Sequence, residues 1–156
     1  MNRIKVKKGQ ILQSSGERNT KAYTVESGLL RSYSIDEHGK EHIFMFAPEG
    51  WIISDAHLSD EDSLLFIDAL EDSEIVVLEK SLSIQPLFAK KLIRRMSVIQ
   101  KRILMLMSSS AIERYDHFIK TYPDITQRVP QKMIASYLGI TPEALSRVKK
   151  ESVDRK

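Results

Sequence analysis

The apolar residues of this chain change their spacing near residue 83, and this change limits the folds open to it. Before residue 83, short runs of alternating character, such as residues 29–35, are separated by turns, a pattern typical of strands in a barrel or sandwich. After it, apolar residues recur every three or four positions, at Leu92, Met96, Ile99, Ile103 and Leu106. That spacing predicts a helix over residues 86–107, roughly 30 Å long. We therefore expect the α+β class, with an antiparallel barrel or sandwich followed by a long helix.

A second pattern, in residues 131–150, indicates two short helices joined by a tight turn. Gly139 stands at the turn, where a residue without a Cβ takes a positive φ at little cost. Thr141 can cap the second helix, and Pro142 suits its first position, where no backbone donor is needed. The arrangement resembles the helix-turn-helix of DNA-binding proteins, whose second helix enters the major groove. An ordinary αα-hairpin is the alternative.

The apolar row of the long helix needs a partner, either the β domain or the same helix of a second chain. Helix-turn-helix proteins commonly read two half-sites as two-fold dimers, so we predict a homodimer. Its dimerisation seam would consist of Leu92, Met96, Ile99, Ile103 and Leu106. The charged residues beside this row are all Lys or Arg, so apolar burial rather than interhelical salt bridges would drive the pairing.

The net charge of +3 conceals a marked asymmetry. Residues 41–79 hold eleven Asp or Glu and no Lys or Arg, whereas residues 80–156 hold sixteen Lys or Arg against six Asp or Glu. A polyanion such as double-stranded DNA would be attracted to the C-terminal part and repelled by the middle of the chain. Alternatively, the acidic and basic surfaces pair within the fold or across a dimer, and both interpretations can hold together.

Composition disfavours several classes of protein. The chain contains no Cys, so we expect neither disulfides nor an iron–sulfur cluster. No apolar run reaches the eighteen or so residues of a membrane helix. Charged residues rather than an apolar stretch follow Met1, so we expect no signal peptide, no membrane partner and a cytoplasmic location.

Metal-dependent catalysis is a further alternative. His38 and His42 cluster with two Glu at a predicted hairpin, but they lack the His-x-His plus Glu pattern of metal-binding barrels. The carboxylate-rich loop around His57 lacks the ordered spacing and Gly of a calcium loop. Without a nucleophile motif or a phosphate-cradling Gly loop, we predict a protein that is not an enzyme and has no metal site and no cofactor.

Four segments stand out as motifs: residues 25–31 (VESGLLR), 46–51 (FAPEGW), 69–74 (ALEDSE) and 128–147 (RVPQKMIASYLGITPEALSR). With the order of β domain, long helix and helix-turn-helix, they resemble the Crp/Fnr family of bacterial transcription regulators. The last segment resembles the form found in Bacteroidetes members. The resemblance implies an antiparallel, cyclic-nucleotide-binding-like β-roll of jelly-roll type over residues 1–82, a long dimerisation helix over 83–108 and a small helical helix-turn-helix domain over 109–156. We expect the family's usual β-hairpin wing to be missing behind the second helix.

The same resemblance suggests how an effector would meet the roll. Ser54-Asp55 and Ser63 occupy the places of the Gly-Glu pair and the Arg that contact ribose and phosphate in cyclic-nucleotide-binding members. Because residues 41–79 contain no basic residue, a buried phosphate would lack a cationic partner, and we predict that cyclic nucleotide does not bind. A pocket for an unknown neutral or apolar effector would be lined by Trp51, Ile53, Ser54, Asp55, Ser63 and Phe66.

The resemblance also carries over the base-facing positions of the recognition helix. Glu143 can accept from a cytosine amino group, and Arg147 can donate to guanine. The full set of predicted DNA contacts is Thr141, Pro142, Glu143, Ser146, Arg147, Lys149 and Lys150, with the two lysines on phosphates. We predict a DNA-binding transcription regulator. The alternative is a sensor or interaction module that keeps the roll without binding DNA.

Overall fold

A computed structural model describes residues 2–18, 20–56, 61–80 and 86–154. The chain forms two compact units, residues 1–92 and residues 93–156, so the boundary falls within the long helix α1 (Pro86–Ser108). Within the described ranges, no helix is long and apolar enough to cross a membrane.

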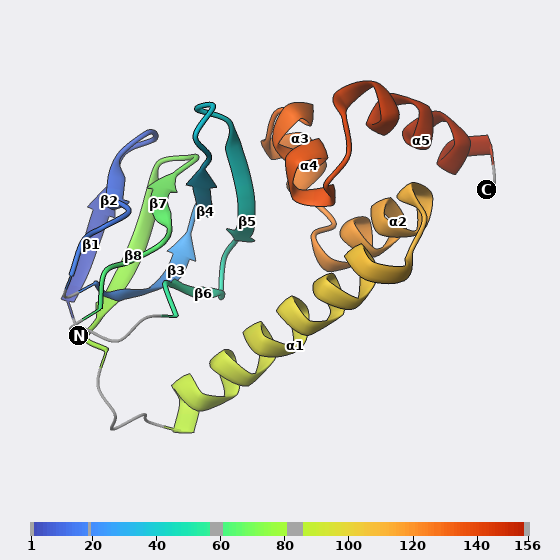
Figure 1. The fold of residues 1–156 in the computed structure, drawn as a ribbon. Helices are drawn as coiled ribbons and strands as arrows, with labels where there is room; N and C mark the ends of the chain where they lie inside the picture. The colour runs from blue at the N-terminus through green and yellow to red at the C-terminus, as the bar shows by residue number, and fades with distance from the viewer. Residues whose placement is uncertain (1, 19, 57–60, 81–85, 155–156) are drawn as a thin grey trace. The chain divides into compact units, whose positions relative to one another are not determined.

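The N-terminal unit contains two four-stranded antiparallel sheets (Figure 1). The strands are β1 (Asn2–Val6), β2 (Ile11–Gln13), β3 (Ala22–Ser27), β4 (Leu30–Ile35), β5 (Glu41–Ala47), β6 (Ile52–Ser54), β7 (Phe66–Ala69) and β8 (Ser73–Leu78). One sheet has the order β1-β8-β3-β6 and the other the order β2-β7-β4-β5. Most neighbours in each sheet are distant in sequence, as expected for a jelly-roll type of β-roll.

The core of this unit lies between the two sheets. One sheet contributes alternate residues such as Tyr23 and Val25, and the other contributes Met45 and Ala47. Since successive side chains of a strand point to opposite faces, residues two apart enter the same core. The alternation in the sequence thus translates directly into two sheets packed face to face.

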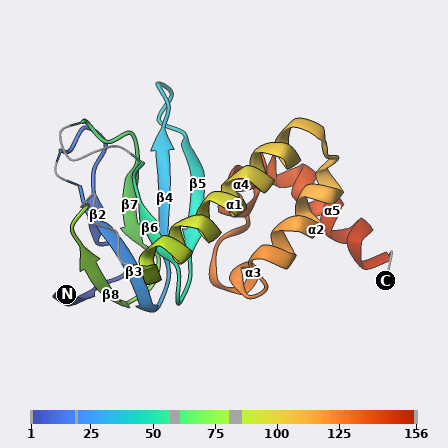
Figure 2. The same ribbon diagram turned by 90° about the horizontal axis from the view of Figure 1, so that it is seen from below.

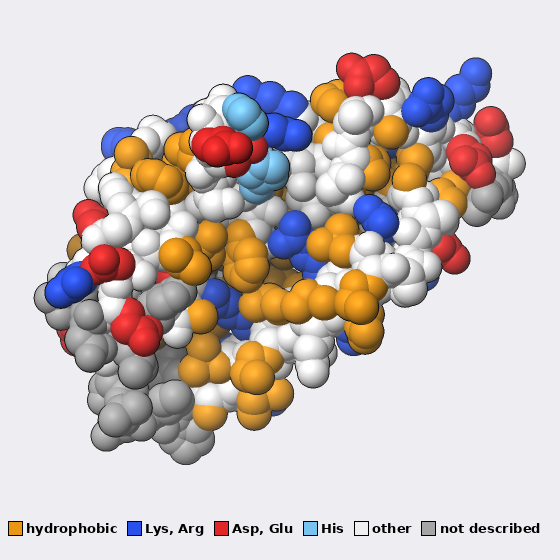
Figure 3. Space-filling model, in the orientation of Figure 1, with side chains coloured by type: hydrophobic (Ala, Val, Ile, Leu, Met, Phe, Trp, Pro, Cys, Tyr) orange, Lys and Arg blue, Asp and Glu red, His pale blue; other side chains and the backbone are white. Residues whose placement is uncertain are grey.

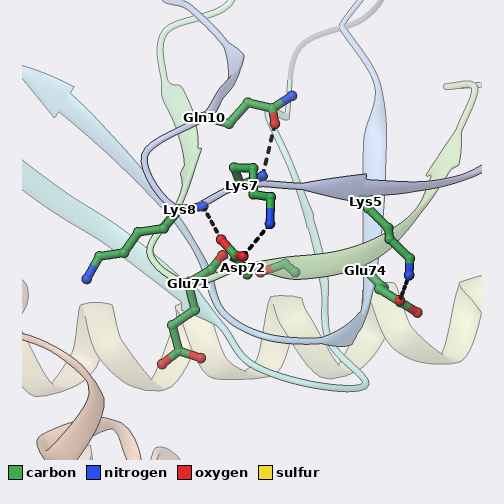
Figure 4. A network of polar contacts seen from close by, with 8 residues as sticks. Lys5, Lys7, Lys8, Gln10, Glu71, Asp72 and Glu74 are labelled. Atoms are coloured by element: carbon green, nitrogen blue, oxygen red, sulfur yellow. Dashed lines mark hydrogen bonds and ion pairs between the residues drawn. The ribbon is translucent and has the colours of Figure 1, made fainter.

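Ion pairs join the acidic middle segment to the basic N-terminal segment. In Figure 4, Lys5 pairs with Glu74, its register partner across β1 and β8, and Lys7 Nζ lies 2.7 Å from Asp72 Oδ2. The Asp72 carboxylate also accepts from the backbone N–H of Lys8. Further pairs of this kind are Arg18–Asp62, Lys21–Glu79, Arg31–Glu41 and Arg31–Asp68. Much of the asymmetric charge is therefore paired within the N-terminal unit.

The C-terminal unit consists of helices around an aromatic core. After α1 come α2 (Ala111–Thr121), α3 (Ile125–Arg128), α4 (Gln131–Leu138) and α5 (Pro142–Asp154) (Figure 2). Phe118, Tyr122 and Tyr137 contact one another with ring centroids 5.3–5.6 Å apart. Ser110 and Glu113 form a capping box at the start of α2, which satisfies two backbone N–H groups that the helix itself leaves without partners.

The predicted α+β class is confirmed, with eight strands before five helices in the described ranges. The long helix begins at Pro86 and ends at Ser108, one residue beyond the predicted end. β7 runs only from Phe66 to Ala69. The backbone N–H groups of Leu64 and Leu65, just before it, donate to the carboxylate of Asp55.

Candidate DNA-binding surface

The turn between α4 and α5 is a Schellman motif. Gly139 has φ of +65°, and its N–H donates to the carbonyl of Ser136 at 3.2 Å. The N–H of Ile140 donates to the carbonyl of Ala135 at 3.0 Å. These two bonds satisfy carbonyls that the end of a helix leaves without partners, and they require a left-handed residue at the turn. Gly139 therefore fixes the angle at which the chain enters α5.

Thr141 caps α5, as the sequence predicts. Its hydroxyl accepts from the N–H of Ala144 at 3.2 Å, and Pro142 takes the first helical position. The N–H of Glu143 and the hydroxyl of Thr141 lower the pKa of the Glu143 carboxyl by donating to it, and Arg147 one turn later adds to the effect. Glu143 therefore presents a carboxylate at the positive end of the helix dipole.

The two faces of α5 differ in character. Leu145 and Val148 are buried, and α5 packs on α2 within the C-terminal unit. The opposite face is exposed at Thr141, Pro142, Glu143, Ser146, Arg147 and Lys150, whereas Lys149 is half-buried. In Figure 3, basic and acidic side chains lie over the region that α5 occupies in Figure 1. The Ser146 hydroxyl donates back to the carbonyl of Pro142 at 3.1 Å.

Two arginines outside the motif support the turn, and sequence reasoning missed both roles. Arg102 of α1 donates to the carbonyl of Tyr137 at 2.9 Å, with its guanidinium carbon 4.1 Å from the centre of the Tyr137 ring. Burial lowers the pKa of Arg102. Arg114 of α2 donates to the carbonyl of Leu138 at 3.3 Å. Both contacts join residues at least 24 positions apart, so no local spacing signals them.

The predicted dimerisation residues of α1 differ in exposure. Met96 and Ile103 are exposed, whereas Leu92, Ile99 and Leu106 are half-buried. Leu106 lies beside the turn of the helix-turn-helix, since its Cδ2 is 3.5 Å from the position that a Cβ atom would occupy on Gly139. The exposed stripe of α1 consists of Ile93, Met96, Ile103, Leu104 and Met107, and Figure 3 shows hydrophobic side chains along the course of α1.

The polar residues of the predicted effector pocket form bonds within the roll. Asp55 is buried, and its carboxylate accepts from the N–H groups of Leu64 and Leu65 at 2.9 and 3.0 Å. The Ser54 hydroxyl donates to the carbonyl of Asp55, and the Ser63 hydroxyl donates to the carbonyl of Ser14 at 2.7 Å. The bonds of Asp55 and Ser63 therefore hold residues 63–65, directly before β7.

The apolar pocket residues lie on both sheets. Ile53 is fully buried in the core, and Trp51 packs against that core from just before β6. Phe66 opens β7 and stacks on Tyr33 with centroids 5.3 Å apart. His57 and Asp60 lie outside the described residues.

A buried arginine in the roll is a second feature that sequence reasoning missed. Arg31 donates through Nε and Nη2 to the two carboxylate oxygens of Asp68 at 2.8 and 2.9 Å. Its Nη1 donates to Glu41 at 2.6 Å. Although burial acts to lower the pKa of Arg31, the two carboxylates outweigh it and raise this pKa. The sequence does contain one sign of this ion pair. Arg31 is a charged residue next to Leu30, in a strand that is otherwise mostly apolar or neutral.

Each of the two hairpin histidines lies beside a different carboxylate. His42 Nε2 lies 2.8 Å from Asp36 Oδ2, and His38 Nε2 lies 3.5 Å from Glu37 Oε1. Within the part of the chain that the structure describes, no group of three or more His, Cys, Asp or Glu side chains could hold a metal ion.

Sequence comparison matches the model of the cyclic nucleotide-binding domain to residues 3–87, more than half of the chain. The regulatory protein HlyX of Actinobacillus pleuropneumoniae is 29% identical over 163 residues, covering 92% of this chain and 68% of that protein. The fumarate and nitrate reduction regulatory protein of Vibrio cholerae is 28% identical over 163 residues, covering 92% and 65%. The chain thus spans about two thirds of the length of these relatives, which are regulators rather than enzymes. They give no support to the expected likeness to Bacteroidetes members.

Comparison of structures gives the same fold. FixK2 from Bradyrhizobium japonicum has a TM-score of 0.77 and 22% identity, covering 99% of this chain and 85% of that chain. A transcriptional regulator of the CRP/FNR family from Thermus thermophilus has a TM-score of 0.76 and 17% identity, covering 99% and 87%.

Proposed function

The chain belongs to the Crp/Fnr family of transcription regulators, and from that premise we propose that it binds double-stranded DNA as a homodimer through α4 and α5. The exposed polar face of α5 supports this proposal most directly. It carries Glu143 and Arg147 one helical turn apart, on a helix held from behind by Leu145 and Val148. Such a helix, fixed in angle by a capped turn, has the form that enters a major groove.

Within this proposal, the residues of α5 divide by role. Arg147 donates to guanine and Glu143 accepts from cytosine, which selects sequence. Lys149 and Lys150 contact phosphates, which position the helix without selecting sequence, and Thr141, Pro142 and Ser146 lie beside the bases or the backbone. Because chromosomal DNA is the target, the protein acts in the cytoplasm.

The dimer forms through α1 in this proposal. The exposed stripe Ile93, Met96, Ile103, Leu104 and Met107 supports it, because exposed apolar side chains in one row along a helix are stabilised by burial against a partner. A two-fold dimer presents two copies of α5 to half-sites roughly 34 Å apart on one face of the DNA. The preferred site is therefore a palindrome.

The β-roll does not take cyclic nucleotide in this proposal. The buried cation Arg31 is paired with two carboxylates, and Asp55 is bonded to the backbone of Leu64 and Leu65. The Arg31 side chain lies on the face of its sheet opposite to its core neighbour Leu30, and a phosphate entering the roll beside Asp55 would meet a buried carboxylate. An effector of the roll is then a neutral or apolar molecule, in contact with Trp51, Ile53 or Phe66.

Selection of sites from random DNA, followed by titrations over a range of salt, tests the proposal. The expected result is a palindrome that binds at salt concentrations which abolish binding to scrambled DNA, because sequence-specific contacts persist when counterion release contributes less. Equal affinity for the selected and scrambled DNA at every salt concentration would contradict it. That outcome favours a sensor or interaction module that keeps the fold.

A further inference from the structure

Arginines hold the end of α1 and the helix-turn-helix together at the carbonyl ends of their helices. Arg102 donates to the carbonyl of Tyr137, in the last turn of α4, and lies over that residue's ring. Arg114 donates to the carbonyl of Leu138, the last residue of α4, and to that of Leu106 near the end of α1, at 3.3 and 3.1 Å. We define these two side chains as the arginine clamp.

The chemistry of these contacts makes the clamp strong. The last carbonyls of a helix carry partial negative charge and lack partners within the helix, so a cation that donates to them is doubly favourable. A guanidinium offers several donors in a fixed plane, which one side chain can distribute between two helices. Stacking on the Tyr137 ring restricts the Arg102 side chain further.

The clamp spans the short connection between α1 and α2. α1 ends at Ser108 and α2 starts at Ala111, so Ser109 and Ser110 form the connection between them. Arg114 Nε donates to the carbonyl of Ser109 at 3.0 Å, and its Nη2 reaches back to Leu106. One side chain thus bonds both sides of the junction and the end of α4.

We propose that Arg102 and Arg114 are positioning residues that set the direction of α5 relative to the end of α1, and thereby the half-site spacing that a dimer accepts. This inference rests on the proposed function, in which α1 pairs two chains and α5 enters the groove. If α1 forms the dimer axis, the angle between α1 and the motif determines the separation of the two recognition helices. A fixed angle then gives a narrow spacing preference.

The first test measures DNA binding against half-site spacing. Wild-type protein, Arg102→Gln and Arg114→Gln are titrated with a single half-site and with palindromes whose spacing changes one base pair at a time. Each variant should lose about 2- to 30-fold in affinity at the best spacing, the range measured for residues that couple distant sites, and show a flatter spacing profile. Affinity for the single half-site should fall no more than in the matched controls Lys101→Gln and Lys120→Gln, which remove the same charge from exposed positions.

Two outcomes would overturn the inference. One is an unchanged spacing profile in both variants. The other is an equal loss on single half-sites and palindromes, because the arginines would then only maintain the fold of the motif. Arg102→Lys keeps the cation over Tyr137 without the planar fork, so it serves as a milder variant if Arg102→Gln does not fold.

The second test does not depend on DNA. Since the chain has no Cys, spin labels can be placed at Gln100→Cys in α1 and Lys132→Cys in α4, both exposed positions. Labelled chains diluted with unlabelled ones report the distance within one chain. A narrow distance distribution in the wild-type background that broadens with Arg102→Gln or Arg114→Gln is expected, and an equally narrow distribution in the variants would contradict the clamp. If no preferred palindrome exists but the distribution broadens, the proposed function fails while the clamp holds.

Discussion

Arg147 is the residue of α5 on which the proposed sequence preference most depends. Its side chain is exposed one turn after Glu143, and a guanidinium can donate two bonds to guanine. Arg147→Ala should weaken binding to the selected site by about 1–3 kcal/mol and relax the preference at one base pair. Titrations with all four bases at each position of the half-site measure both effects.

Lys150→Ala provides the contrast for Arg147→Ala. Lys150 is also exposed on α5, but as a phosphate contact it should weaken binding to all sequences alike and make the salt dependence less steep. If Arg147→Ala behaves in the same way as Lys150→Ala, Arg147 does not read a base.

Arg31 and Asp68 give a prediction on stability. Their side chains are only 8% and 10% exposed, so removal of one partner leaves a buried charge that is poorly compensated. Arg31→Met should therefore lower the free energy of unfolding by about 3–5 kcal/mol. Denaturant unfolding, monitored by tryptophan fluorescence, measures the change, since Trp51 packs against the core of the N-terminal unit.

The double variant Arg31→Met/Asp68→Leu is the control for this pair. It removes both buried charges, and replacement of an ion pair by apolar residues is often nearly neutral, so it should be more stable than Arg31→Met alone. A single variant that loses no more than about 1 kcal/mol, the value typical of an exposed ion pair, would contradict the role given to Arg31.

Residues whose partners are close in sequence could be predicted, and those with distant partners could not. Gly139 and Thr141 are bonded within five residues along the chain, so their roles follow from local chemistry. Arg31 meets Asp68 37 residues away, and Arg102 meets Tyr137 35 residues away. Such pairs depend on strand order and helix packing, which the spacing of apolar residues does not specify.

Among the elements, α1 has an exposed stripe with a direct consequence for assembly. Met96 is 65% exposed and Ile103 is 52% exposed, and both are buried in the proposed dimer. Met96→Glu/Ile103→Glu should weaken dimerisation about 100-fold or more, because each uncompensated charge in an interface costs several kcal/mol. Sedimentation equilibrium over a range of concentrations measures the dissociation constant.

Lys101→Glu is the matched control for the α1 variant, because Lys101 is an exposed, charged position on the same helix. It should leave the dimer nearly unchanged. If both proteins dimerise equally well, the stripe is not the interface and the two chains meet elsewhere, or not at all.

The periodicity of α1 predicts the helix but not which of its sides is exposed. Apolar residues occupy two neighbouring rows of the helix. Leu92, Ile99 and Leu106 recur every seven positions, whereas Ile93, Met96 and Ile103 are three and seven positions apart. In the structure the first row is half-buried and the second is exposed. For Leu106, contact with the turn at Gly139 accounts for the difference, a contact that depends on the packing of the C-terminal unit.

At the scale of the whole molecule, charge is partly neutralised in one unit and in excess in the other. Lys5, Lys7 and Arg31 pair with carboxylates of residues 41–79, so the acidic character of that segment is reduced where the chain folds on itself. The family model that matches residues 3–87 describes a cyclic nucleotide-binding domain, whereas the ligand that we propose for this roll is neutral or apolar. The fold of the roll could be predicted from the sequence, whereas the class of ligand depends on the individual side chains inside the roll.

Calorimetric titration of the whole chain with cAMP and with cGMP tests this difference. A bound phosphate would need a desolvated cation, and the guanidinium of Arg31 already bonds Asp68 and Glu41 through all three of its nitrogens. We therefore expect no saturable heat with ligand up to about 1 mM, which corresponds to less than about 4 kcal/mol of binding free energy. Micromolar binding of either nucleotide would contradict the prediction.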